Sequence, residues 1–147
     1  MDTASIVFLD RLLAEPGIRE AARQLGCPPS TVMAAVRRTE EALAVRLFQP
    51  SGNGLMRTLD GERLQPIFAA LAVETRRLFP GRDASKTVPM LGLEALHRVL
   101  TVALKGSIRA AAREVGIGQP QLTRQIGHVE NRTGLLLFHR RDRKSVV

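Results

Sequence analysis

The sequence predicts a mainly α-helical fold in which one small module occurs twice in tandem. Shifting the chain by 90 residues places 18–48 over 108–138 without a gap, and nine of these 31 pairs are identical. The composition alone would give roughly two or three identities. Both copies also show the same order of amphipathic helical segments and turns. We therefore expect a duplicated helical unit.

The composition is that of a folded, basic protein. The chain has 147 residues, 44% of them hydrophobic, and a formal net charge of +8. Its single cysteine, Cys27, excludes an internal disulfide. No apolar run approaches the length of a membrane span, and the N-terminus lacks the basic region of a signal peptide. We expect a soluble cytoplasmic protein that does not contact a membrane.

The positive charge is concentrated in the second copy. Residues 1–90 hold 12 basic and 10 acidic side chains, a net charge of +2, whereas residues 91–147 hold 10 and 4, a net charge of +6. With no Trp or Tyr and only five Phe, the chain is poorly suited to stacking on single-stranded bases. Duplex phosphate is the polyanion that fits best.

The first copy is predicted to contain three helices. Ser5 can cap the first, which Pro16 ends. A short second helix is expected over 18–25, and Gly26 stops it. The third is expected over 30–44, where strong helix formers follow two prolines.

The second copy repeats this order with clearer end signals. Gly106 ends its first helix, Ser107 caps the second, Gly116 forms the turn, and Pro120 is expected at the first position of the third. A short helix, a turn of about four residues and a longer helix make the helix-turn-helix plan, in which the last helix enters the major groove.

After its third helix the first copy predicts a wing and a long helix. Two apolar stretches flank Gly52-Asn53-Gly54, which favours a β-hairpin. Asp60 can then cap a linker helix over 61–79, distorted near Pro66. Its expected apolar face consists of Leu64, Ile67, Phe68, Leu71, Leu78 and Phe79.

These elements give three expected segments: a first winged helix-turn-helix with its linker helix over 1–80, a polar linker over 81–90, and a second winged helix-turn-helix over 91–147. The second copy ends inside its wing, so we expect a truncated wing and a chain that is a fragment of a longer protein.

The second copy carries a distinctive set of residues: Leu96-x-x-Val99, Gly106-Ser107-Ile108, Ala111-Ala112-Arg113, Gln119 through Ile126, Glu130 and Leu137-Phe138. This set resembles the N-terminal DNA-binding domain of LysR-type transcriptional regulators, over about 93–147 and more weakly over 6–79. The resemblance implies a winged helix-turn-helix whose linker helix pairs two subunits. It also implies that the family's effector domain is missing, so no small-molecule effector site is expected. In the first copy, Arg57 and Asp60 depart from the family pattern at the junction of wing and linker helix.

The resemblance places part of the third helix of the second copy on DNA. Arg can bond guanine O6 and N7, Gln can bond adenine N6 and N7, and Thr can bond phosphate or pack on a thymine methyl. The alternative is an exposed polar helix face. The predicted DNA-contacting residues are Gln119, Gln121, Thr123, Arg124 and Gln125, with Arg124 the most important.

Other arginines are predicted to contact phosphate, with simple solvation as the alternative. Arg109 and Arg113 lie on the second helix of the second copy, and the resemblance places Arg140, Arg141 and Arg143 in its wing.

The first copy has lost most of this chemistry. Ala34 and Ala35 stand where the second copy has Arg124 and Gln125, and alanine cannot read base edges through hydrogen bonds. Arg37 and Arg38 remain one turn further along the helix and can touch phosphate. We expect weak or nonspecific DNA binding from this copy.

Enzyme chemistry is not expected. The chain lacks a phosphate-binding glycine loop, a nucleophile elbow and any metal-ligand spacing, so no catalytic residue, cofactor or metal is predicted.

Two functions remain open. The chain is a sequence-specific, double-stranded DNA-binding regulator, or it is a dimerising module that modulates a full-length relative without recognising DNA itself. In either case we expect the chain to form a homo-oligomer, or an intramolecular pseudo-dimer, through its 61–79 helix.

Overall fold

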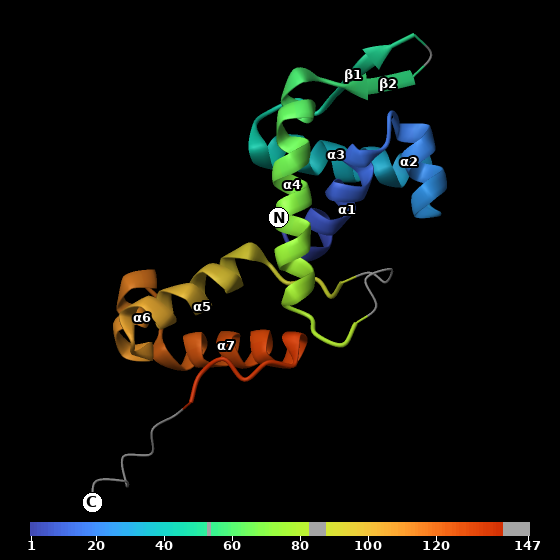
Figure 1. Cartoon of the computed structure of the whole chain (residues 1–147). Coiled ribbons are helices and arrows are strands. Elements are labelled where there is room, and N and C mark those ends of the chain that lie inside the picture. The colour runs from blue at the N-terminus through green and yellow to red at the C-terminus, as the bar shows by residue number, and fades with distance from the viewer. Residues whose placement is uncertain (53, 83–87, 140–147) are drawn as a thin grey trace, which may run out of the picture.

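The computed structural model describes residues 1–52, 54–82 and 88–139, which form two groups of helices (Figure 1). The first module consists of α1 (Thr3–Ala14), α2 (Ile18–Leu25), α3 (Pro29–Leu43), β1 (Phe48–Ser51), β2 (Gly54–Arg57) and α4 (Leu59–Arg77). The second module consists of α5 (Leu93–Lys105), α6 (Ile108–Val115) and α7 (Gln119–Thr133). The mainly helical winged helix-turn-helix architecture is confirmed.

Each module is built around a pair of alanines on its short middle helix. Ala21 and Ala22 of α2 are buried in the first module, and Ala111 and Ala112 of α6 are buried in the second. A methyl side chain lets two helix backbones approach closely, so α3 and α7 can pack tightly on the helices before them. The two pairs are therefore packing residues.

The N-terminal cap of α1 differs from the expectation. Ser5 is not the cap, because the Asp2 carboxylate accepts a hydrogen bond from the Ser5 backbone N–H at 2.8 Å and the helix starts at Thr3. Asp2 has extended backbone geometry and forms an isolated β-bridge with Gly92. A cap needs such a non-helical residue at the point of entry.

The cap of α4 was also predicted at the wrong residue. Thr58, not Asp60, is the N-cap, and its hydroxyl oxygen accepts from the Gly61 N–H at 3.0 Å. The same hydroxyl donates to the carbonyl of Arg46. Because the cap residue is anchored to the chain before the wing, α4 begins at Leu59, two residues earlier than expected.

The wing of the first module is the predicted hairpin. Strands β1 and β2 pair antiparallel, with Phe48 opposite Arg57 and Ser51 opposite Gly54. In the second module, the described residues 135–139 form no strand, and the rest of the segment expected to form a truncated wing lies outside the described residues.

The third helices begin and end at nearly equivalent positions. Pro29 is the first residue of α3, whereas Pro120 is the second of α7, because Gln119 already has helical geometry. Both helices end in the left-handed conformation, at Gly134 in α7 and at Ala44 in α3. This conformation costs an alanine about 1–2 kcal/mol, so the first module carries strain there that the second avoids.

A short pairing joins the two modules. Thr3 is fully buried; its N–H donates to the Leu91 carbonyl at 3.0 Å and its hydroxyl donates to the Pro89 carbonyl at 2.7 Å. The Leu91 N–H donates back to the Thr3 hydroxyl oxygen at 2.9 Å. The chain entering α5 is therefore held against the N-terminus of the first module.

A small apolar cluster supports this pairing. Phe79, Leu91 and Val129 are buried together, so they connect the end of α4, the chain before α5 and helix α7. Figure 1 shows the second module at the end of α4 that lies away from the hairpin.

The apolar face predicted for α4 is divided between two environments. Phe68 is buried against α1 and Phe79 against the second module, but Ile67 and Leu71 remain 53% and 43% exposed. Since α1 takes up only one side of the helix, the opposite side is left uncovered in the described part of the chain.

The first helix of the second module has no α4-like cover among the described residues. In the first module, Thr3 and Ile6 of α1 are buried, whereas Leu93 and Leu96, at the same places on α5, are partly open to solvent. Further along α5, Leu100 and Leu104 are 54% and 77% exposed. Among the described residues, Leu93, Leu100 and Leu104 therefore form an exposed apolar face of α5, whereas Leu96 packs against the cluster of Phe79, Leu91 and Val129.

Gly61 marks the closest approach between the wing and α4. A Cβ at this position would collide with the backbone carbonyl of Leu47. A carbonyl held by the Thr58 N–H cannot easily move, since that hydrogen bond is 2.9 Å long and forms the base of the wing. The site requires glycine for steric reasons.

We predict that Gly61→Ala lowers the free energy of unfolding by about 1–3 kcal/mol, the usual cost of overpacking. Gly127→Ala is the control, because a Cβ there meets open space within a helix, and it should raise stability by about 0.5–1 kcal/mol. Urea unfolding followed by circular dichroism measures both. Equal stability of the Gly61→Ala variant and the wild type would contradict this packing argument.

Candidate nucleic-acid interface

The outward face of α7 carries the long polar side chains of the second module. Leu122 and Ile126 are buried in the module core, and this orientation turns Gln121 and Arg124 outward, where both are exposed. Gln119 is likewise exposed at the first turn. A helix that presents its first two turns in this way has the geometry needed to enter a groove.

Thr123 and Gln125 lie on the two flanks of this face. The Thr123 hydroxyl donates to the Gln119 carbonyl at 3.0 Å, which leaves its oxygen free to accept. Gln125 is half-buried beside α5, and its Oε1 accepts a 2.6 Å hydrogen bond from Nη1 of Arg98. The five predicted residues of α7 therefore lie near one another, but they differ in exposure and in whether their side chains are already hydrogen-bonded within the protein.

The two modules differ in the charge of their second helices. In α2, Arg23 contacts Glu20 at 2.6 Å, and this hydrogen bond lowers the pKa of the Glu20 carboxyl. In α6, Ala110 takes the place of Glu20 in the repeat, and no carboxylate of the described residues lies within ion-pairing distance of Arg113. Arg113 and Arg109 are both exposed, so their charges remain available to an anion.

One carboxylate in each module joins the third helix to the wing. Oε1 of Glu130 accepts hydrogen bonds from the N–H groups of Leu137 and Phe138 at 2.9 and 3.3 Å. Glu40 binds Leu47 and Phe48 in the same way at 2.7 and 3.2 Å. The carboxylate satisfies two backbone donors, so it sets the direction in which the chain leaves the third helix.

The predicted wing arginines Arg140, Arg141 and Arg143 lie outside the described residues.

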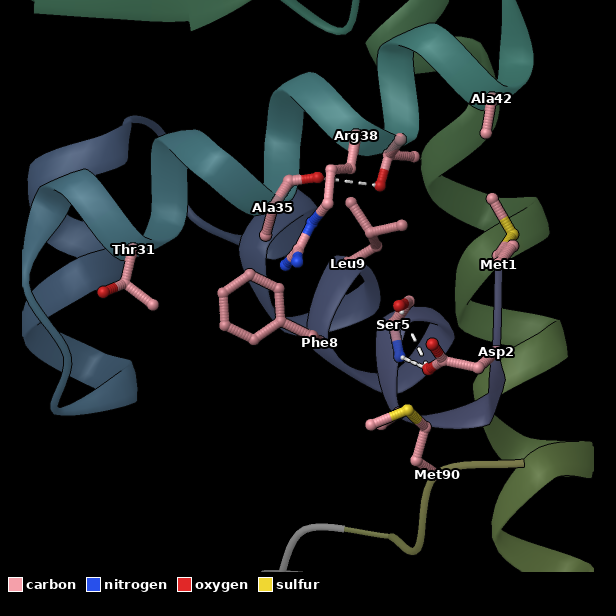
Figure 2. Close-up of a pocket in the computed structure, with 12 residues that line it drawn as sticks. Met1, Asp2, Ser5, Phe8, Leu9, Thr31, Ala35, Arg38, Ala42 and Met90 are labelled. Atoms are coloured by element: carbon pink, nitrogen blue, oxygen red, sulfur yellow. Dashed lines mark hydrogen bonds between the residues drawn. The ribbon is translucent and has the colours of Figure 1, made fainter. Parts of the chain in front are cut away.

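The first module has a groove beside its third helix in place of a polar reading face. Arg37 and Arg38 are exposed on α3, and Ala34 and Ala35 leave the turn before them short of side-chain atoms. In Figure 2 the Arg38 side chain extends across the groove toward the Phe8 ring. The cavity has a volume of about 440 Å³ and is lined by Met1, Asp2, Ala4, Ser5, Phe8, Leu9, Thr31, Ala35, Arg38, Thr39, Ala42 and Met90.

The sequence did not predict the contacts of two arginines, Arg57 and Arg98. Arg57 departs from the family pattern, yet its guanidinium contacts the Leu13 carbonyl, Gln65 and Glu62, so it fastens the wing to α1 and α4. Arg98 holds Gln125. The sequence offers no signal for Arg98, because most aligned positions differ between the two copies and its partner lies on another helix.

Other kinds of site receive no support from the described residues. In residues 1–52, 54–82 and 88–139, no group of three or more His, Cys, Asp or Glu side chains is placed to hold a metal ion. No described helix is long and apolar enough to cross a membrane.

We predict that Glu130→Ala lowers the free energy of unfolding by about 2–3 kcal/mol, because it removes the charged acceptor of two backbone N–H groups. Glu130→Gln retains an acceptor oxygen of similar reach and should cost about 1 kcal/mol or less. Urea unfolding of the two variants gives the comparison. Identical losses would mean that the acceptor oxygen is not what stabilises the wing.

Comparisons with known proteins agree with this geometry. The family model described as bacterial regulatory helix-turn-helix protein, lysR family, matches two segments, 5–62 and 93–147. The small neutral protease regulatory protein of Streptomyces coelicolor is 47% identical over 45 residues, which are 31% of this chain and 14% of that relative. The chain thus matches only a small part of the relative's length. No solved structure matches the chain.

Proposed function

The chain belongs to the LysR family of bacterial regulatory helix-turn-helix proteins, and from this membership we propose that its second module binds a defined sequence of double-stranded DNA. The family is one of DNA-binding transcriptional regulators and not of enzymes. The observation that carries the proposal is the exposed face of α7, on which Gln121 and Arg124 project side chains suited to base edges.

The surrounding charges support the same module. Arg109 and Arg113 stand exposed on α6 without the acidic neighbour that neutralises Arg23 in α2. Arg140, Arg141 and Arg143 add three positive charges after α7. In our proposal these five arginines contact phosphate and give affinity, whereas Arg124 and its neighbours on α7 give sequence preference.

The first module is proposed to contact DNA weakly. Arg37 and Arg38 can bind phosphate, but the alanines before them offer nothing to a base edge. In this proposal the functional segments are a first winged helix-turn-helix with its linker helix over 1–80 and a second over 91–147. Acting on chromosomal DNA, the chain would work in the cytoplasm at the nucleoid.

We predict that Arg124→Ala lowers discrimination between a selected duplex and a random one by about 1–3 kcal/mol, the value of one bidentate arginine contact. Arg37→Ala is the matched control in the first module and should leave discrimination unchanged. Fluorescence anisotropy with competitor DNA, repeated at several salt concentrations, measures both. If Arg37→Ala abolishes discrimination and Arg124→Ala does not, the first module is the reader.

The chain is further proposed to form a homodimer through α4. Ile67 and Leu71 form an apolar surface that the second module leaves open, which favours pairing between chains over an intramolecular pseudo-dimer. The α5 leucines Leu100 and Leu104 offer a second apolar surface that a partner helix can cover. These surfaces also favour the second candidate function, a dimerising module that modulates a related regulator without reading DNA itself.

We predict that Leu71→Glu shifts a dimer toward monomer and raises the dissociation constant at least about tenfold, since a charge would be buried in an apolar interface. Light scattering over a range of concentrations measures this. Leu104→Glu tests whether α5 takes part, and Met56→Glu, on the exposed side of the wing, is the control. A wild-type chain that stays monomeric at every concentration would refute the dimer.

A further inference from the structure

Gln125 is held by a charged residue of another helix, and this limits what it can offer to DNA. Nη1 of Arg98 donates to Oε1 of Gln125 at 2.6 Å, and Nη2 of the same guanidinium contacts Oε1 of Glu94 at 2.6 Å. The Arg98 side chain is only 18% exposed. A short, charge-assisted and largely buried hydrogen bond fixes the amide firmly.

The chemistry of arginine fixes the orientation of the amide. A guanidinium has only donors, so the Gln125 atom that faces it must be the carbonyl oxygen. Because Oε1 is turned toward α5, the amide nitrogen Nε2 is the atom left to face outward. Nε2 carries two N–H donors and no acceptor.

The consequence for base recognition is specific. A free glutamine recognises adenine with both ends of its amide: Oε1 accepts from N6 while Nε2 donates to N7. This contact needs both atoms directed at one base. The bond to Arg98 occupies one of the two lone pairs of Oε1 and holds this oxygen toward α5, so it disfavours the two-atom contact. A donor alone fits guanine best, because N7 and O6 both accept, and it also fits thymine O4. Adenine offers N7 alone and places its N6–H₂ donor beside it, and cytosine presents N4–H₂ with no acceptor.

Resting on the proposed DNA-binding function, we propose that Arg98 is a positioning residue for specificity: it turns Gln125 from an adenine reader into a donor that prefers guanine or thymine. In this proposal Gln125 and Arg98 have different roles. Gln125 contacts the base, and Arg98 acts only through it.

The internal repeat offers no counterexample to this pairing of roles. In the first module, the positions of Arg98 and Gln125 are occupied by Phe8 and Ala35, so neither member of the pair is present without the other. Phe8 also shows that an apolar side chain can occupy this place in the fold. Burying Arg98 at this position is unfavourable, because its Nε has no hydrogen-bond partner among the described residues. Such an orphan donor is a cost that an apolar residue would avoid.

The test uses the full chain and a duplex that the wild type enriches from a random-sequence pool, together with versions of it substituted one base pair at a time. Gln125→Ala first identifies the base pair that Gln125 reads. At that pair, the wild type should prefer guanine or thymine. Arg98→Met frees the amide and should raise the affinity for adenine relative to guanine about five- to tenfold, with preferences at the other base pairs unchanged.

Three further variants separate positioning from a general structural role. Glu94→Gln removes the ionic partner of Arg98 but leaves its bond to Gln125, so the base preference should persist. Adding Arg98→Met to Gln125→Ala should change nothing further. Gln125→Glu leaves Arg98 intact and presents an acceptor outward, so preference should move toward cytosine or adenine, whose exocyclic amines donate. This last variant tests the idea even if Arg98→Met does not fold.

Each remaining outcome has a clear meaning. If Arg98→Met leaves the preference unchanged, or weakens every base pair equally, Arg98 does not position Gln125 and the inference is overturned. It is also overturned if Gln125→Ala alters no base preference. If the wild type enriches no sequence at all, the proposed function fails, and the inference fails with it.

Discussion

The architecture depends on one carboxylate in each module, Glu40 and Glu130, which accepts two backbone hydrogen bonds from the Leu-Phe pair at the start of the wing. The backbone of an α-helix does not by itself fix the direction of the chain that follows its last turn. The carboxylate supplies that direction, because it projects from the last turns of the third helix and captures two N–H groups that would otherwise be unpaired. These bonds fix the third helix and the segment after it to each other, as the proposed contact with both a groove and the adjacent phosphates requires.

On this shared frame the two modules have diverged in surface chemistry and in how far their first helix is covered. The buried alanine pairs and the carboxylate tie occur in both. The differences lie in exposed or half-exposed positions: Arg23 is neutralised by Glu20 while Arg113 is not, and the pair Arg98–Gln125 is present in the second module alone. Surface substitutions cost little stability, so one copy can lose recognition chemistry while it keeps the fold.

Much of the fold could be read from the sequence because its signals are local. Helix periodicity, the Gly26 and Gly116 turns and the glycine-rich hairpin are decided by residues close together in the chain, and the structure agrees with them. The caps at Ser5 and Asp60 were wrong for the opposite reason. Several residues near each helix start can serve as a cap, and contacts with distant segments selected Asp2 and Thr58. The same holds for the candidate site. The types of residue on α7 were predictable from the sequence, but the hydrogen bond that holds Gln125 to Arg98 of another helix was not.

The sequence by itself determined that the chain has two helix-turn-helix units, which family they resemble and which unit carries polar side chains along its third helix. Only the tertiary structure decided how these units meet and which side chains are engaged. Thr3 and Leu91 are 88 residues apart, and Arg98 and Gln125 lie on different helices. Periodicity along one helix reports which face is buried, but it carries no information about the partner across the interface, because that partner is selected by the packing of the whole chain.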